Sequence, residues 1–194
     1  MNRRYLRATV AAASLFGGAF GAVAWLAPAP RLLWNASASA PIGLYRIDTG
    51  ARPVAGDLVA IEPPAALGDW FAQRGYLPRG VPLLKRVAGV PGQRICRSGV
   101  FVTIDGRGAA RALARDRLGR PLPIWLGCRL IGRGEFFLLN AAPESLDSRY
   151  FGAIPATGLI GVAQPIWTRA ATRTPLRSRQ PRIHPNPNLE HTGE

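Results

Sequence analysis

The sequence predicts one mostly β domain that follows a single N-terminal membrane-spanning helix. Three observations lead to this fold class. Residues 8–30 carry no charge, short apolar segments alternate with turn residues over most of the remaining chain, and glycine (22) and proline (18) are frequent. Such glycine and proline contents favour turns and short strands over long helices. A chain of 194 residues accommodates one membrane segment and one domain of ordinary size.

The first 30 residues have the pattern of a signal anchor. Arg3, Arg4 and Arg7 precede the uncharged run, which predicts a cytoplasmic N-terminus and a domain outside the cytoplasm. A membrane-spanning helix needs about 20 apolar residues, whereas the core of a cleavable signal peptide needs about 7–15. We therefore expect residues 1–30 to anchor the chain in membrane lipid. Small residues at Ala27 and Ala29 leave a cleaved signal peptide as the alternative.

Residues 31–169 read as the folded domain. Seven segments, each rich in aliphatic or aromatic residues and bounded by turn residues, are predicted strands: 44–48, 57–63, 83–90, 99–105, 123–128, 135–140 and 159–167. Asp105-Gly106 after an alternating run indicates a hairpin. We interpret residues 109–118 as its return arm, with a short helix as the alternative.

Residues 170–194 are polar, basic and proline-rich, and we expect them to be disordered because they offer little apolar surface to bury. The formal net charge of the chain is +14. Arginines in this tail could contact DNA or anionic lipid, so a non-enzymatic, basic, membrane-tethered component of a secretion or conjugation apparatus is an alternative function. We expect no specific binding of nucleic acid.

The two cysteines, Cys96 and Cys128, are expected to form one disulfide if the domain is exported, with two free buried thiols as the alternative. On the loop-entropy model such a bond would stabilise the fold by about 3–4 kcal/mol. Both histidines, His184 and His191, lie in the tail, so no cluster with the spacing of metal ligands exists in the sequence. No metal and no cofactor is predicted.

The position of the two histidines also limits which catalytic nucleophiles the chain can activate. A serine or cysteine activated by histidine needs that histidine on a rigid scaffold, and residues 170–194 do not offer one. The remaining system is a serine with a lysine base. Lys85 is the only lysine in the chain, and every other basic side chain is an arginine, which cannot accept a proton. In a strand, Lys85 would share a face with Leu83 and Val87, and burial there would lower its pKa.

Three segments, NASASAPIGLY (35–45), LLKRVAGVPGQ (83–93) and ESLDSRYFG (144–152), resemble in order and spacing the signature boxes of type I signal peptidases. The closest match is the conjugative-transfer branch, the TraF-type peptidases. The resemblance covers residues 5–165. It implies a signal-peptidase or LexA-like coiled β-sheet catalytic domain. A self-cleaving LexA-type repressor shares the chemistry, but it would need a DNA-binding domain where this chain has its apolar segment.

The resemblance also assigns roles to individual residues. It implies that Ser39 is the nucleophile and that the Ser37 hydroxyl helps to bind the oxyanion. Lys85 maps to the general base and Ser145 to the hydroxyl that positions it. Asp147 and Arg149 map to a supporting ion pair. Pro41 comes one position earlier than in general signal peptidases, and the segment LLNAAPE stands where they have the run GDNRDN. The early proline leaves Ser37 as the alternative nucleophile.

The function that the resemblance implies is a serine endopeptidase with a Ser-Lys dyad. Its substrate would be an exported precursor polypeptide, and in this branch a conjugative pilin precursor, with cyclisation as an alternative to hydrolysis. The implied location is the bacterial inner membrane, with the catalytic domain in the periplasm. Components of a type IV secretion or conjugation machine are candidate partners.

Overall fold

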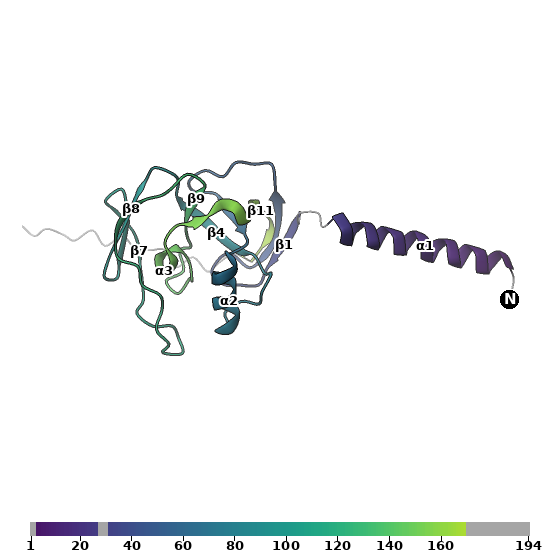
Figure 1. Cartoon of the computed structure of the whole chain (residues 1–194), viewed down its shortest axis with the longest axis horizontal. Coiled ribbons are helices and arrows are strands. Elements are labelled where there is room, and N and C mark those ends of the chain that lie inside the picture. Colours follow the sequence, from purple (N-terminus) through teal and green to yellow (C-terminus); the bar gives the residue numbers. More distant parts are fainter. Residues whose placement is uncertain (1–2, 27–30, 170–194) are drawn as a thin grey trace, which may run out of the picture.

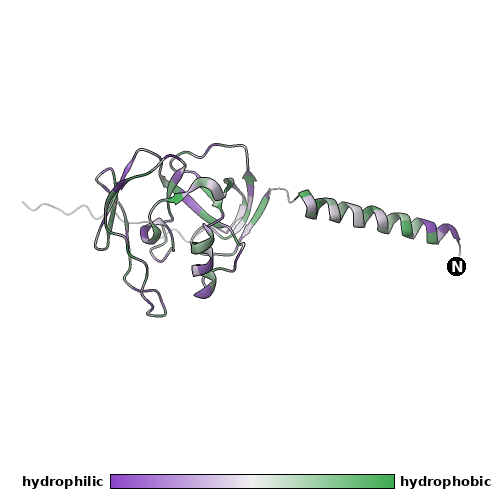
Figure 2. Ribbon diagram, viewed as in Figure 1, coloured by the Kyte–Doolittle hydropathy of each residue, from purple (hydrophilic) through white to green (hydrophobic). Residues whose placement is uncertain are grey.

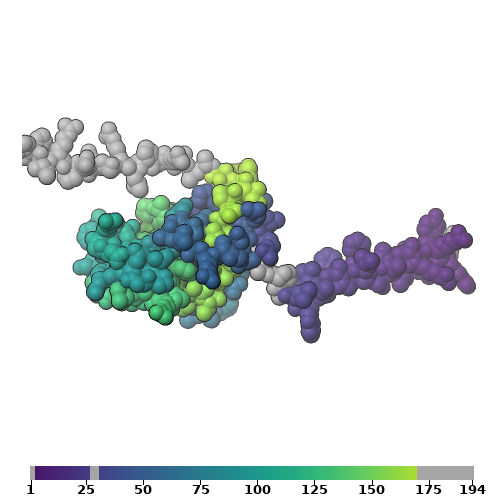
Figure 3. Space-filling model, turned by 90° about the horizontal axis from the view of Figure 1, so that it is seen from above, coloured from purple at the N-terminus to yellow at the C-terminus, as the bar shows by residue number. Residues whose placement is uncertain are grey.

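The computed structural model describes residues 3–26 and 31–169. Helix α1 (Arg3–Leu26) stands apart from a β-rich domain (Figures 1 and 3). At about 1.5 Å per residue its 24 residues extend for about 36 Å, enough to cross a hydrocarbon core of about 30 Å. None of its residues is buried, and its hydrophilic residues gather at its start (Figure 2). The helix is long and apolar enough to serve as a single-pass membrane anchor.

The larger sheet of the described domain has the strand order β1-β2-β11-β3-β4-β9-β10, and all its neighbours are antiparallel. Its strands are β1 (Leu32–Asn35), β2 (Gly43–Asp48), β3 (Leu58–Ile61), β4 (Leu83–Gly89), β9 (Glu135–Leu139), β10 (Ile154–Pro155) and β11 (Leu159–Thr168). β11 runs between β2 and β3, so the end of the domain joins two strands from its beginning. This confirms the predicted mostly β fold class.

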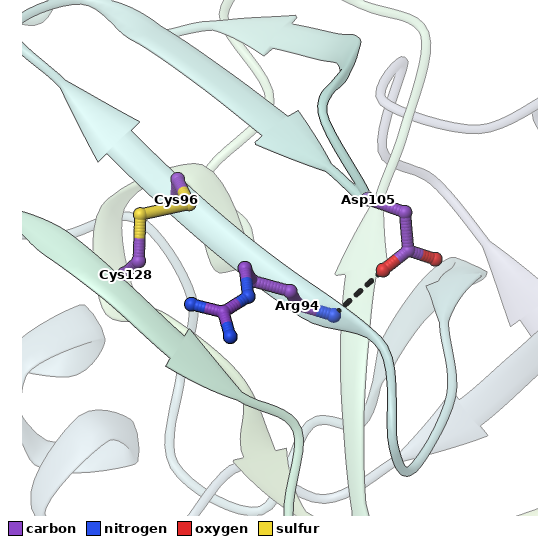
Figure 4. Close-up of a disulfide and its surroundings, with 4 residues drawn as sticks. All are labelled: Arg94, Cys96, Asp105 and Cys128. Carbon is purple, nitrogen blue, oxygen red and sulfur yellow. Dashed lines mark hydrogen bonds between the residues drawn. A yellow bond between two sulfur atoms is a disulfide. The ribbon is translucent and has the colours of Figure 1, made fainter.

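The smaller sheet has the order β7-β6-β5-β8 and is also antiparallel. It consists of β5 (Arg94–Ser98), β6 (Phe101–Ile104), β7 (Arg107–Arg111) and β8 (Gly127–Leu130). Asp105 and Gly106 both have positive φ at the predicted hairpin. Cys96 and Cys128 face each other on β5 and β8 and are joined by a disulfide (Figure 4). On β5 the backbone N–H of Arg94 donates to Asp105.

Two predicted segments differ from the structure. The strand expected over 123–128 begins only at Gly127, and residues 123–126 have no regular structure. The return arm of the hairpin is β7, which ends at Arg111, and residues 112–122 leave the sheet as a loop. We call residues 112–122 the arch. Its arms are joined by an isolated bridge between Arg115 and Pro121 and turn through Gly119, where φ is positive. Asp116, Gly119 and Pro121 fall together in the second half of the arch, a spacing typical of a turn, and the ladder of the smaller sheet does not continue through it.

Several elements were not predicted. They are strands β1, β5 and β10, helices α2 (Ala65–Gln73) and α3 (Ser148–Phe151), and the short 3-10 helix η1 (Ala156–Gly158). α2 begins after Pro64, whose fixed φ suits the start of a helix. The predicted tail, residues 170–194, lies outside the described residues.

Apolar clusters cover both faces of the larger sheet. Along β3, Val59 and Ile61 belong to one cluster, whereas Ala60 between them belongs to another, as alternation in a strand requires. A third cluster contains Ile95 and Phe137 and packs the smaller sheet against the larger one. The central strands therefore have few exposed positions, and a polar side chain there needs an internal partner.

Candidate active site

Ser37 and Ser39 lie in the loop between β1 and β2. Their hydroxyl oxygens are 3.0 Å apart, and the backbone N–H of Ser39 donates to Ser37 Oγ over 3.3 Å. Ser37 is exposed, whereas Ser39 is half-buried and precedes the buried Ala40. The two serines therefore differ in their surroundings, and Ser39 is the more enclosed.

The buried amide of Asn35 holds the loop from inside. Its Nδ2 donates to the carbonyls of Ser37, Ala40 and Pro41, at 2.9, 3.2 and 3.0 Å, and its Oδ1 accepts from the N–H of Ser37 at 3.0 Å. The hydroxyl of Tyr45 donates to the carbonyl of Pro41 at 2.6 Å. Two side chains at the ends of the segment 35–45 thus fix the backbone that carries both serines.

Gly43 ends the serine loop where β2 meets β11. Its φ is +155°, and a Cβ built on it would lie 2.1 Å from the carbonyl oxygen of Trp167. Any larger residue would push β11 away from the loop. The glycine in the motif is therefore required by the close approach of two strands that are more than 100 residues apart in the sequence.

Lys85 lies on β4 and is only 4% exposed. Its ammonium group donates to Ser145 Oγ at 2.8 Å. Burial lowers the pKa of this amine from 10.5 to about 8, while the nearby Asp147 raises it and Arg149 lowers it. An amine with a pKa near 8 has a substantial neutral fraction at physiological pH, so it can accept a proton.

The loop that carries Ser145 is supported by a buried ion pair. Arg149 Nε lies 2.7 Å from Asp147 Oδ1, and both side chains are almost inaccessible to solvent. Arg149 also donates to the carbonyls of Asn140 and Pro143, and Asp147 caps α3 by accepting from the N–H of Arg149. Because these additional hydrogen bonds also satisfy the guanidinium and the carboxylate, neither charge is left buried without a partner.

Asn140, just after β9, supports Lys85 and was not identified from the sequence. Its Nδ2 donates to the carbonyl of Leu84 at 3.0 Å, and its Oδ1 accepts from the N–H of Arg86 at 3.2 Å. Its own N–H donates to Asp147 at 3.0 Å. Asn140 thus bonds through its side-chain amide to both neighbours of Lys85 and through its backbone N–H to the ion pair. The only sequence signal was a polar asparagine as the last residue of the predicted strand 135–140.

The four polar residues Ser37, Ser39, Lys85 and Ser145 line one cleft of about 690 Å³. Other parts of its lining come from the end of α2 and from the arch. In the described part of the chain no hydrogen bond joins Ser39 to Lys85, a separation that is common at catalytic sites before a substrate binds. The ion pair Asp147–Arg149 lies behind Ser145, and the disulfide lies on the smaller sheet outside this lining.

The serine loop, the buried Lys85 and Ser145 therefore meet in one cleft of a β domain. The model of the signal peptidase family, peptidase S26, matches residues 2–168, and the chain belongs to this family. Conjugal transfer protein TraF of Agrobacterium fabrum is 39% identical over 144 residues, which cover 69% of this chain and 81% of that protein. The chain is therefore a type I signal peptidase homologue of the TraF type.

Further relatives carry similar names. A probable conjugal transfer protein TraF of Sinorhizobium fredii is 43% identical over 146 residues, covering 70% of this chain and 77% of that protein. The plasmid transfer protein TraF of Escherichia coli is 26% identical over 144 residues, 69% of this chain and 81% of that protein. A signal peptidase I structure from Enterococcus faecalis aligns with a TM-score of 0.36 and 19% identity, over 59% of this chain and 98% of that one.

Asn140→Ala is expected to lower kcat of peptide cleavage by about 10- to 100-fold with little change in KM, because Leu84 and Arg86 lose the bonds that fix the backbone on both sides of Lys85. Asn140→Asp places a carboxylate beside Lys85, so the acid side of the pH–rate profile should move to higher pH. Gln93→Ala, which removes an amide bonded to Val90 and Asp105, is the matched control. A variant that is destabilised like the control but keeps its kcat and pH profile would show that Asn140 serves the fold alone.

Proposed function

We propose that this protein is a membrane-anchored serine endopeptidase in which Ser39 is the nucleophile and Lys85 the general base. The observation that carries the proposal is the environment of Lys85: a buried amine with its pKa lowered to about 8, bonded to Ser145 Oγ, in the cleft that Ser39 lines. A titratable side chain that combines a shifted pKa with a position in a cleft is typical of a functional site. Ser145 orients the amine, and Asp147 with Arg149 keeps the Ser145 loop in place.

The reaction begins when neutral Lys85 accepts the proton of the Ser39 hydroxyl while Ser39 Oγ attacks the scissile carbonyl carbon. The oxyanion that forms is stabilised by the Ser39 N–H and the Ser37 hydroxyl. Because the Ser39 N–H donates to Ser37 Oγ in the free protein, the Ser37 side chain must rotate for both groups to face the oxyanion.

Lys85 then gives its proton to the leaving amine, the carbon–nitrogen bond breaks, and an ester to Ser39 remains. In hydrolysis a water molecule loses a proton to Lys85 and attacks this ester. The ester C–O bond breaks, Lys85 returns the proton to Ser39 Oγ, and a carboxylic acid is released. In cyclisation the α-amine of the same substrate chain replaces that water. Both routes return Lys85 to its neutral form.

The proposed substrate is an exported precursor, in particular a conjugative pilin precursor. Support comes from the TraF relatives, whose names place them in conjugal or plasmid transfer. Components of a type IV secretion machine are the corresponding partners. The proposed location is the bacterial inner membrane with a cytoplasmic N-terminus, supported by the arginines in the first turns of α1. A periplasmic domain agrees with a disulfide between Cys96 and Cys128.

Co-expression with candidate pilin precursors, followed by mass measurement of the product, tests this function. A product shortened at one defined bond is expected with the native protein and not with Ser39→Ala. A mass one water below that of the linear product identifies cyclisation. An unchanged precursor for every candidate, with both proteins inserted and folded, would argue against a pilin substrate, and cleavage that survives in Ser39→Ala would contradict the serine mechanism.

A further inference from the structure

The arch forms a firm wall of the cleft because it is bonded to the end of α2. Asp116 of the arch accepts from the Tyr76 hydroxyl and from Arg120 Nε. Desolvation acts to raise the pKa of the Asp116 carboxyl, but the hydrogen bonds from Tyr76 and Arg120 hold it well below its ordinary value. Arg74, which follows α2, donates to the carbonyl of Pro121 at 2.9 Å, and its own carbonyl accepts from Arg120 at 2.9 Å.

Apart from Lys85, the cleft is lined by four arginines and two carboxylates. Both carboxylates are already neutralised. Asp116 pairs with Arg120 at 2.7 Å, and Glu144, the neighbour of Ser145, pairs with Arg117 of the arch. The second pair joins the arch to the loop that carries Ser145.

Arg74 and Arg115 are the two arginines that remain. Arg74 lies over the Trp70 ring and donates to the carbonyl of Pro121, and Arg115 donates to the carbonyl of Gly119 at 2.7 Å. Within residues 31–169 neither has a carboxylate at ion-pair distance. Each guanidinium has five N–H donors and uses only part of them on these carbonyls and, for Arg74, on the Tyr76 side chain, so both groups keep donors for a bound molecule. The cleft therefore has an excess of two positive charges even when Lys85 is neutral.

We propose that Arg74 and Arg115 bind a carboxylate of the polypeptide that occupies the cleft. The group is an acidic side chain or the C-terminal carboxylate of the substrate. This inference rests on the proposed function in one respect, that a polypeptide enters the cleft. A planar guanidinium matches the two oxygens of a carboxylate, and the apolar residues of the lining, such as Phe71 and Leu113, strengthen the interaction by reducing access of water. A basic segment of a substrate would be repelled from the same wall.

The test measures binding separately from catalysis. In the Ser39→Ala protein, the affinity of fluorescent alanine-rich decapeptides is measured by anisotropy, with a single Glu or Gln placed at successive positions and a C-terminal amide on every peptide. At one or two positions we expect Glu to bind about 10-fold more tightly than Gln, because a charge-assisted bond outweighs a neutral one. A second set without acidic residues compares a free C-terminal carboxylate with an amide and separates the two sources.

Variants then show which arginine causes the preference for Glu over Gln. Arg115→Gln and Arg74→Gln should each reduce it several-fold, and Arg115→Lys, which keeps the charge, should restore part of it. Arg107→Gln on β7, outside the cleft lining, is the control and should leave the preference unchanged. Equal affinities for Glu and Gln peptides and for both C-terminal forms, or a preference that survives both Gln variants, would overturn the proposal. Failure of the native protein to cleave these peptides would count against the peptidase reaction and would leave the binding result valid.

Discussion

Ser39→Ala is expected to reduce the rate of precursor cleavage by about 10⁵- to 10⁶-fold, whereas Ser37→Ala is expected to reduce it by about 10²- to 10³-fold. The two values differ because loss of the nucleophile removes the covalent route, while loss of an oxyanion donor removes one hydrogen bond from the transition state. The structure supports this order, since Ser39 is half-buried in the cleft and Ser37 is exposed at its edge.

The measurement is single-turnover cleavage with enzyme in excess, followed by mass spectrometry. Ser39→Ala keeps its backbone bonds, so both variants should retain the melting temperature of the native protein. Asn35→Ala is a useful companion, because it removes four hydrogen bonds from the loop without removing either serine hydroxyl. If Ser37→Ala proves to be the inactive variant and Ser39→Ala the slow one, the nucleophile lies two residues earlier than proposed.

Lys85 gives the second large effect, a steep pH dependence. With a pKa of about 8 the neutral amine is the minor form below that pH, so kcat/KM should rise about tenfold per pH unit and level off above pH 8. At pH 7 roughly a tenth of the amine is neutral, against roughly 0.03% for an unperturbed lysine. The profile is measured from kcat/KM between pH 5.5 and 9.5, where it reports the free enzyme.

Lys85→Arg should abolish cleavage at every pH, because arginine keeps the charge but cannot accept the proton. Lys85→Met should be equally inactive, yet at least as stable as the native protein at pH 7. The pKa of Lys85 is lower in the folded than in the unfolded state, so the buried charge reduces stability below pH 8, and this cost fades as the pH rises towards 10.5. Cleavage by Lys85→Arg, or a flat pH profile, would remove Lys85 from the mechanism.

Much of the fold was predictable because its signals are local. Short apolar runs between turn residues predicted β2, β3, β4, β6, β9 and β11, and Asp105-Gly106 predicted the β6–β7 hairpin. Helix α2 was missed because its segment has neither a strong cap nor basic residues in its last turn. β1 was missed because it has only four residues and lies close to the apolar anchor segment. It is recognisable as a strand from its pairing with β2 and not from its own sequence.

Some residues of the candidate site were recognisable in the sequence, and others only in the structure. Lys85 stands out in the sequence as the only lysine, and the order of the three motifs brings Ser39 and Ser145 to attention. Asn140 did not stand out, because its role depends on bonds to a strand more than 50 residues earlier. The arch was misjudged as part of a hairpin, since only its contacts with the end of α2 make it a wall of the cleft.

By itself, then, the sequence determined the apolar anchor segment, the mostly β class and the residues able to supply serine–lysine chemistry. These depend on composition, on alternation within a strand and on the proton affinity of single side chains. Only the tertiary structure decided that Lys85 is buried against Ser145 and that, among the residues the structure describes, two of the four cleft arginines have no carboxylate partner. Desolvation and charge pairing are properties of neighbours in space, and those neighbours come from segments that lie far apart in the chain.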